Sequence, residues 1–328
     1  MRRSFLIPAT VALAFIGCVR HPSGPRAYVS NERDGTITVI DVNTDRVVST
    51  IKVGARPRGI RTSPDGRRIY VALSVSAQIA GTINKIAAID TSSGEVVAHY
   101  DAGTDPEQFA VSSDGSRLFI SNEDAGTASI VDTGSGKVMS TLIVGIEPEG
   151  ATRSPDGRWV YITAETSNTV SVIDTQSNQV VATFMVGARP RDTAFSPDGT
   201  HAYVTAEQGR ILSIIDTSSH SVIKTVDLPQ GDGVKPMGVV VSNDGKKIYV
   251  ANGRANTVSV IDAGNNTLIA TIPVGKRVWG LAITPDGKKI YAANGLSNDV
   301  SVIDTTTDSV VATVKAGDGP WGIAISGQ

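Results

Sequence analysis

Short apolar runs separated by turn residues recur along almost the whole chain. The stretch 169–174 reads TVSVID, in which Val and Ile alternate with Ser and Asp, and this two-residue period is typical of a β-strand. Asp-Gly pairs between the runs supply the positive backbone angles that tight hairpins need. The unit at 145–187 therefore predicts four strands, placed at Ala151–Ser154, Trp159–Thr163, Val170–Asp174 and Val180–Val186.

This four-strand unit is repeated around the chain. The aspartates that end its third strand are separated by 49, 42, 42, 42, 46 and 42 residues, and they are Asp41, Asp90, Asp132, Asp174, Asp216, Asp262 and Asp304. Four short antiparallel strands at a period near 42 residues indicate one blade of a β-propeller. The sequence thus predicts an all-β fold, a single seven-bladed β-propeller domain over residues 27–328 with four antiparallel strands per blade.

The two ends of the chain do not coincide with the ends of a unit. The repeats begin with a second strand, AYVSN at 27–31, and the chain finishes with a first strand, WGIAIS at 321–326. We expect the strand at 320–326 to pair with the N-terminal strand and close the ring, because both ends would otherwise expose unpaired strand edges.

The repeats resemble those of the YVTN family of β-propellers. YVSN, YVTA, YVAN and YAAN stand at the position of the family's motif, in units that also contain SPDG and TVSVID. RAYVSNERDGTITVID, DPEQFAVSSDG and NGLSNDVSVIDT are similar to the seven-repeat propellers associated with alcohol catabolism that depends on pyrroloquinoline quinone (PQQ). The resemblance implies a periplasmic accessory protein near a quinoprotein dehydrogenase, and it brings no catalytic residues to this chain.

The N-terminus has the pattern of an export signal. Arg2 and Arg3 precede an apolar run from Phe5 to Gly17, which is too short to span a bilayer. FIGC resembles a bacterial lipobox and ends in Cys18, the only cysteine. We expect a lipoprotein-type signal peptide at 1–17, lipid attachment at Cys18, a tether at 18–26, and a periplasmic protein anchored to the membrane through its lipid. If Cys18 is not modified, the protein is expected to be soluble in the periplasm or secreted.

Composition narrows the choice of partners. Charged residues make up 19% of the chain and the formal net charge is −2, so no overall positive field favours nucleic acid. Two local loops, Arg56/Arg58 and Arg189/Arg191, are the only feature that keeps nucleic-acid binding open. We expect a monomer with a protein partner in the periplasm, such as a quinoprotein dehydrogenase or a transport component.

The loops that differ between repeats define the candidate site. Loops before the first strand and loops between the second and third strands share one face, which we call the top face, and variable loops on a rigid scaffold often carry function. The position just before each innermost strand is expected to ring the channel; these mouth residues are Arg58, Glu107, Glu149, Arg191, Met237, Trp279 and Trp321. Two positions earlier stand Arg56, Asp105, Glu147, Arg189, Lys235, Arg277 and Gly319. The same face should be rimmed by Glu32, Glu123, Glu165, Glu207, Asn122, Asn252 and Asn294.

The mouth is expected to combine an acidic sector, flanked on each side by a basic loop, with an aromatic sector. A flat anionic ligand such as PQQ could stack on Trp279 or Trp321 and pair with Arg277, Arg56 or Arg58. Alternatively, the acidic and basic residues could form exposed pairs that merely neutralise the mouth, each contributing about 0–1 kcal/mol. Two insertions, at 73–85 and 228–238, also belong to the top face.

Little in the sequence points to an enzyme. The four histidines, His21, His99, His201 and His220, are expected away from the mouth, which speaks against a haem, a metal site or a histidine-based lyase. We therefore expect a non-enzymatic binding or scaffold protein with no metal and no cofactor other than possible PQQ. Two alternatives remain open: a metal-assisted lactonase- or lyase-like propeller that uses Glu107 and Glu149, and a cell-surface adhesion or surface-layer module.

Overall fold

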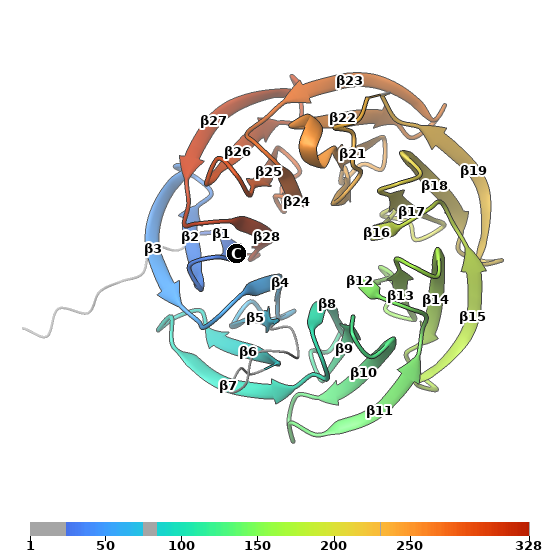
Figure 1. Ribbon diagram of the computed structural model, residues 1–328. Coiled ribbons are helices and arrows are strands. Elements are labelled where there is room, and N and C mark those ends of the chain that lie inside the picture. The colour runs from blue at the N-terminus through green and yellow to red at the C-terminus, as the bar shows by residue number, and fades with distance from the viewer. Residues whose placement is uncertain (1–23, 75–83, 230, 328) are drawn as a thin grey trace, which may run out of the picture.

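Seven four-stranded antiparallel sheets stand around a central channel in the computed structural model, which describes residues 24–74, 84–229 and 231–327 (Figure 1). Each sheet is one blade, with one strand beside the channel and the fourth strand at the outer rim. The predicted all-β, seven-bladed propeller is therefore confirmed. The predicted signal peptide at 1–17, Cys18 and the tether up to residue 23 lie outside the described residues.

The strands are grouped here by their distance from the channel. The innermost strands are β4 (Pro57–Thr62), β8 (Pro106–Val111), β12 (Pro148–Arg153), β16 (Pro190–Phe195), β20 (Val239–Val241), β24 (Val278–Ile283) and β28 (Pro320–Ile325). The second strands are β1 (Arg26–Asn31), β5 (Arg68–Leu73), β9 (Arg117–Asn122), β13 (Trp159–Ala164), β17 (His201–Ala206), β21 (Lys247–Ala251) and β25 (Lys289–Asn294). The third strands are β2 (Thr36–Asp41), β6 (Lys85–Asp90), β10 (Thr127–Asp132), β14 (Thr169–Asp174), β18 (Ile211–Asp216), β22 (Thr257–Asp262) and β26 (Asp299–Asp304). The outer strands are β3 (Arg46–Lys52), β7 (Val96–Asp101), β11 (Val138–Ile143), β15 (Gln179–Met185), β19 (Ser221–Asp227), β23 (Thr267–Pro273) and β27 (Ser309–Lys315).

A single turn of 3-10 helix, η1 (Gly253–Ala255), completes the elements of the described chain. None of the helices in these residues is long and apolar enough to cross a membrane.

The ring is closed by pairing the C-terminal strand with the N-terminal one. β28 lies antiparallel to β1, with Ile325 opposite Ala27 and Pro320 opposite Asn31. Just beyond the strand, the Ser326 N–H donates to the Arg26 carbonyl oxygen at 2.9 Å. The first blade therefore takes one strand from one end of the chain and three from the other, as predicted.

The middle strands are covered on both faces by the adjacent blades. In β14, Ser171 alternates with Val170 and Val172, yet it is as buried as they are. Its hydroxyl donates to the Val144 carbonyl oxygen of the preceding blade at 3.0 Å. The alternation of apolar and hydroxyl side chains along the TVSVID strands thus separates two faces that are both packed against other blades. The hydroxyls on the more polar face bond to the neighbouring blade.

Two kinds of turn account for the repeated aspartates. The PDG-type turns (63–66 and the equivalent four residues in the other blades) join the first strand to the second, on the face opposite the top face. In these turns the first residue's hydroxyl donates to the aspartate, as Ser63 Oγ does to Asp65 Oδ1 at 2.6 Å. The aspartates that end the third strands accept backbone N–H groups from the following turn; Asp304 Oδ1 accepts from Thr306 at 2.8 Å and from Thr307 at 2.9 Å. Both are local turn-capping arrangements that short polar side chains favour.

The innermost strands begin earlier than the apolar pattern predicted. β12 starts at Pro148 rather than Ala151, because Pro148 already pairs with Ala164 before a bulge shifts the register to Ala151 opposite Ile162. The same irregularity occurs in β4, β8, β16, β24 and β28. In these six blades the mouth residue lies inside the strand, in the bulge, and not just before it.

The insertion at 228–238 is partly structural. Leu228 and Val234 are only 2% and 5% exposed and belong to the hydrophobic core between two blades. Met237 is likewise buried, and its N–H donates to the Ala251 carbonyl oxygen at 2.9 Å. Residues 75–83 of the other predicted insertion, and residue 230, lie outside the described residues.

Candidate functional site

The backbone of the mouth is fixed by hydroxyls from the second strands. Ser30 Oγ donates to the Arg58 carbonyl oxygen at 2.6 Å, and Ser121 Oγ donates to that of Glu149 at 2.6 Å. Thr163 Oγ1 donates to the Arg191 carbonyl oxygen at 3.0 Å. Each hydroxyl comes from the preceding blade. The bulge and this bond therefore set each mouth side chain at a defined place around the channel.

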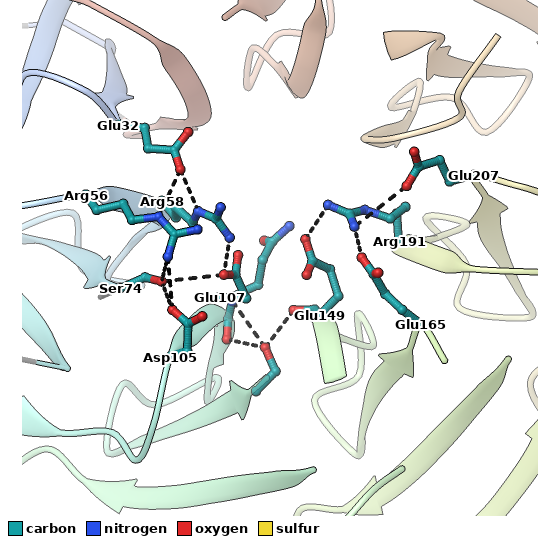
Figure 2. A network of polar contacts seen from close by, with 12 residues as sticks. Glu32, Arg56, Arg58, Ser74, Asp105, Glu107, Glu149, Glu165, Arg191 and Glu207 are labelled. Atoms are coloured by element: carbon teal, nitrogen blue, oxygen red, sulfur yellow. Dashed lines mark hydrogen bonds and ion pairs between the residues drawn. The ribbon is translucent and has the colours of Figure 1, made fainter. Parts of the chain in front are cut away.

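The first ion-pair cluster joins three blades on one side of the mouth (Figure 2). Arg58 Nε lies 3.0 Å from Glu32 Oε1, and its Nη1 pairs with Glu107. Arg56 Nε lies 3.2 Å from the same Glu32 oxygen, and its Nη1 lies 3.3 Å from Asp105 Oδ1. Two guanidinium groups thus hold three carboxylates.

The second ion-pair cluster, on the other side of the mouth, has the same number of arginines and carboxylates (Figure 2). Arg191 Nη2 lies 2.6 Å from Glu149 Oε1, and its Nη1 pairs with Glu165. Arg189 Nε lies 2.6 Å from Glu165 Oε2 and 3.1 Å from Glu207 Oε2. Here too two guanidinium groups serve three carboxylates, so each cluster has one negative charge in excess when all groups are ionised.

The Arg58–Glu107 and Arg191–Glu149 pairs are buried, which contradicts the interpretation of exposed, weakly contributing pairs; Arg56 and Arg189 remain partly exposed. Glu107 is 0% exposed, Glu149 3% and Arg191 9%. Although burial acts to lower it, the pKa of Arg58 is raised above its ordinary value by the Glu107 and Glu32 carboxylates. Removing one partner of a buried pair leaves an uncompensated charge away from water, so the clusters are structural as well as electrostatic features of the mouth.

The residues two positions before the mouth are held in a left-handed backbone conformation. Arg56, Asp105, Glu147, Arg189 and Arg277 have φ angles of 52°, 49°, 56°, 57° and 57°. Residues other than glycine adopt this conformation rarely. In the two RPR loops it allows both arginines of the loop to reach the same set of carboxylates.

The aromatic sector completes the mouth. Trp279 and Trp321 are stacked, with ring centroids 6.2 Å apart and an interplanar angle of 28°. Arg277 lies over Trp279 at 4.5 Å from the ring centroid, while Arg58 and Arg191 lie at 5.7 Å and 5.9 Å from the rings of Trp321 and Trp279. The structure thus brings together all eight top-face candidates, Arg56, Arg58, Glu107, Glu149, Arg191, Arg277, Trp279 and Trp321.

The sequence of this propeller matches a family profile described as "Lactonase, 7-bladed beta-propeller" over residues 18–144 and 177–317. The chain belongs to the lactonase family. No curated protein is detectably similar to it in sequence.

Solved structures share the fold of this lactonase-family propeller at low sequence identity. Hydrazine synthase from Kuenenia stuttgartiensis has a TM-score of 0.76 at 23% identity, over 86% of this chain and 92% of that chain. A functionally unknown protein from Desulfotomaculum acetoxidans has a TM-score of 0.77 at 19% identity, over 93% and 99%. A candidate 6-phosphogluconolactonase from Bacteroides uniformis has a TM-score of 0.78 at 19% identity, over 92% and 100%. At these identities the likeness establishes the fold alone.

Two carboxyl groups in the mouth have strongly displaced proton affinities. Burial, together with the nearby Glu107 and Glu149 carboxylates, raises the pKa of Glu123 to about 8. Burial also raises the pKa of Glu149, although the Arg191 guanidinium acts in the opposite direction. Carboxyl groups displaced in this way are able to exchange protons near neutral pH.

The acidic sector of this lactonase-family propeller also gathers possible metal ligands. Carboxylate oxygens of Asp105, Glu107 and Glu123 all lie within 4.8 Å of one another. Hard divalent cations prefer such oxygen ligands. However, Arg56 and Arg58 already pair with Asp105 and Glu107, so guanidinium groups supply much of the positive charge that a metal ion would bring.

Some expected rim residues have structural roles instead. Asn122, Asn252 and Asn294 are buried, and their Nδ2 groups donate to the third-strand hydroxyls of Ser129, Ser259 and Ser301 at 2.9, 2.8 and 3.0 Å. The three histidines of the described chain lie away from the mouth: His99 in β7, His201 in β17 and His220 in a turn, where it bonds to Tyr161.

Sequence reasoning missed two polar residues immediately below the mouth, Gln108 and Asp192. In the other five blades this position is glycine, namely Gly59, Gly150, Gly238, Gly280 and Gly322. The departure from the repeat was visible in the sequence and could have identified both residues.

Proposed function

We propose that this lactonase-family propeller is an exported, non-enzymatic binding protein that holds a periplasmic partner protein on its top face. The observation that carries this is the filling of the mouth. The cavity beside Glu149, Trp279 and Trp321 measures about 30 Å³, and that beside Arg254 and Arg277 about 10 Å³. Such volumes accommodate about one water molecule, whereas cavities for small organic molecules usually measure about 300–1,000 Å³. The top face therefore suits docking better than enclosure of a substrate.

One part of this face has the composition of a protein-binding surface. Lys235, Arg254, Arg277 and Trp279 lie around the smaller cavity together with one carboxylate, Glu207, and we call the first four residues the basic patch. Arg254 is exposed, and Arg277 and Trp279 are partly exposed. In the described part of the chain, no carboxylate forms an ion pair with Arg254 or Arg277. Arginine and tryptophan are enriched among the residues that dominate protein interfaces, so the patch suits an acidic surface on the partner.

A PQQ-dependent alcohol dehydrogenase is the partner that the sequence repeats favour. The test measures binding of the purified dehydrogenase to the soluble fragment that starts at Pro22, by biolayer interferometry. An Arg254→Glu, Arg277→Glu double variant should weaken binding by about tenfold or more, since charge reversal opposes an acidic surface.

The matched control reverses two charges on the opposite face. Lys246 and Lys288 belong to PDG-type turns, and their side chains are 80% and 77% exposed. A Lys246→Glu, Lys288→Glu double variant should bind like the unaltered protein. Absence of binding to the dehydrogenase, or equal weakening by both double variants, would contradict the proposed docking surface.

PQQ itself is tested separately as a ligand. Trp279 and Trp321 stack at the mouth and Trp159 lies in β13. Saturable quenching of tryptophan fluorescence by PQQ that is lost in a Trp279→Phe, Trp321→Phe double variant would indicate a direct cofactor role. Absence of saturable quenching would leave protein docking as the role of this face.

Hydrolysis of a lactone is a second candidate, favoured by the family and by Glu149. This carboxyl group has a raised pKa and lies beside Arg191; a general base and an oxyanion-stabilising cation are the groups that acyl transfer requires. A purified fragment that opens 6-phosphogluconolactone faster than buffer, with the rate lost in Glu149→Gln, would replace the binding proposal. The small cavity beside Glu149 weighs against that result.

Export and anchoring are part of the proposal. Cys18 should incorporate radiolabelled palmitate in a bacterial host, and Cys18→Ser should release the protein from the membrane fraction. Equal membrane association of the two forms would exclude a lipid anchor at this residue.

A further inference from the structure

A larger cavity lies in the channel below the mouth. It measures about 450 Å³ and is lined by the innermost strands of all seven blades. It extends from Gln108 and Asp192, just under the mouth, to Phe195 and Ile283, where the innermost strands reach the PDG-type turns. We call this cavity the lower channel. Its volume is within the range of cavities that bind small organic molecules.

The two sides of the lower channel differ in chemistry. All the charged, amide and hydroxyl side chains that line it come from four consecutive innermost strands, β4, β8, β12 and β16. They are Arg61, Thr62, Gln108, Thr152, Arg153, Asp192 and Thr193. The strands β20, β24 and β28 contribute glycine, Trp321 and aliphatic side chains only. A ligand in this cavity therefore meets a polar wall on one side and an apolar wall on the other.

The polar wall has an excess of positive charge. Arg61 donates to Gln108 Oε1 at 2.7 Å and to the Ile60 carbonyl oxygen at 3.0 Å. Arg153 donates to Ser113 Oγ at 2.8 Å and to the Ser154 carbonyl oxygen at 3.2 Å. Within the described chain, neither guanidinium has a carboxylate within ion-pair distance, and burial lowers the pKa of both. Each retains donors that an anion can use.

Asp192 offsets only part of this charge. Its carboxylate accepts the backbone N–H groups of Thr193 at 2.9 Å and Val239 at 3.3 Å, and so joins two blades. It interacts electrostatically with Arg61 across the cavity, but does not contact it as an ion pair. Among the side chains that line the cavity, two guanidinium groups and one carboxylate leave one positive charge in excess. Asp156, in the following turn and outside the cavity, also acts on Arg153.

Two hydroxyls of the polar wall have no partner. Thr152 Oγ1 and Thr193 Oγ1 are buried, and neither forms a hydrogen bond among the described residues. Both residues line the lower channel. Buried hydroxyls without a partner are uncommon because they forgo a hydrogen bond, so this wall contains unpartnered polar groups, although neither oxygen is itself exposed to the cavity.

We propose that the lower channel binds a small organic monoanion, with its carboxylate on the Arg61–Arg153 wall and its apolar body against β20, β24 and β28. The excess charge matches one carboxylate, and the aliphatic wall covers a chain or ring. This site lies on the other side of the mouth residues from the basic patch and does not depend on the proposed docking function.

Octanoate is the probe, used with the soluble fragment from Pro22 in isothermal titration calorimetry. Saturable binding is expected, and 1-octanol, which has the same chain without the charge, should bind about tenfold or more weakly. Inorganic phosphate, which has charge but no apolar body, should also bind more weakly. Equal binding of octanol would overturn the role of the arginines, and equal binding of phosphate would overturn that of the apolar wall.

Matched variants locate the site. Arg61→Gln and Arg153→Gln should each weaken octanoate binding about tenfold, whereas Arg67→Gln, on an exposed turn of the same blade, should leave it unchanged. Ala282→Phe places a ring in the cavity from the apolar wall and should abolish octanoate binding. This variant tests the site independently of the arginines, in case an arginine variant does not fold. Absence of saturable binding by the folded fragment, or identical affinities in Arg67→Gln and the two channel variants, would overturn the proposal.

Discussion

Arg58 and Arg191 each pair with a glutamate that lies almost entirely out of water, Glu107 and Glu149. Taking such charges out of water is costly, and their attraction compensates only when both partners are present. The mouth therefore depends on its charge balance. Glu123 has no arginine partner of this kind in the described chain. It faces Glu107 and Glu149, and its pKa is raised by burial and by both of these carboxylates.

The first prediction concerns pH. Because the pKa of Glu123 rises from 4.5 to about 8 on folding, the folded state retains a proton that the unfolded state releases between these values. Stability therefore falls as pH rises through this window. Glu123→Gln should remove that decline and stabilise the protein by about 1–2 kcal/mol at pH 8.5, after allowance for solvent screening.

The measurement is urea unfolding from pH 5 to pH 9. Asp124→Asn serves as the control, since Asp124 is the exposed neighbour in the same loop, and its curve should follow that of the unaltered protein. Parallel curves for Glu123→Gln and the unaltered protein would show that Glu123 titrates normally.

The second prediction concerns the pairs themselves. Arg191→Met leaves Glu149 and Glu165 without their shared partner and should destabilise the fold by about 3–5 kcal/mol. Arg277→Met removes a cation–π contact with Trp279 and should cost about 1 kcal/mol or less. Thermal or urea unfolding measures both, and equal losses would argue against a buried ion-pair network.

At the scale of the element, a bulge in six of the seven innermost strands forms the site. It inserts one residue beside the mouth residue. In four of these six strands the residue after the mouth residue is glycine, because the next blade approaches closely. A Cβ on Gly59 would lie 2.5 Å from the Glu107 carbonyl oxygen and 2.9 Å from the Gln108 Cα. Both atoms are backbone, so the contact is relieved only by moving the blades apart.

The third prediction follows from that contact. Gly59→Ala should destabilise the protein by about 2 kcal/mol or more, an overpacking cost. Gly264→Ala is the control, because a Cβ there meets only Asp262 Oδ1 at 3.4 Å, and it should change stability by less than about 0.5 kcal/mol. Melting temperatures within one degree of each other would show that the bulge tolerates a side chain.

At the scale of the whole molecule, one strand joins the two ends of the chain. β28 packs on β1 and contributes Trp321, Ile323 and Ala324, which are 6%, 5% and 7% exposed. Without it, β1 would present an unpaired edge to the channel and the apolar wall of the lower channel would lose a strand. Stability, mouth and channel therefore all depend on this single pairing.

The fourth prediction tests this closure. A chain that ends at Gly319 should melt far below the full chain, whereas removal of residues 327–328 alone should have little effect. A synthetic peptide covering 318–328 should raise the melting temperature of the shortened chain by occupying the place of β28 beside β1. An unchanged melting curve for the chain ending at Gly319 would contradict closure by β28.

The repeat alone determined the architecture. Strand alternation, Asp-Gly turns and a period near 42 residues are local properties, so the number of blades, their four strands and the closing strand could be predicted from the order of residues. The positions of Arg58, Glu107, Trp279 and Trp321 around one mouth followed from the same repeat, since equivalent positions in a propeller share one ring.

What the sequence could not determine was burial, because burial depends on how closely the blades approach. The bulge at Glu149 and its equivalents arise within a blade, where the first strand pairs with the second. The withdrawal of Glu107 from water and the roles of Gln108 and Asp192 arise from contacts between blades. Only the tertiary structure could show that the charges pair in two buried clusters, that the mouth is filled, and that a channel with a cationic and an apolar wall lies beneath it.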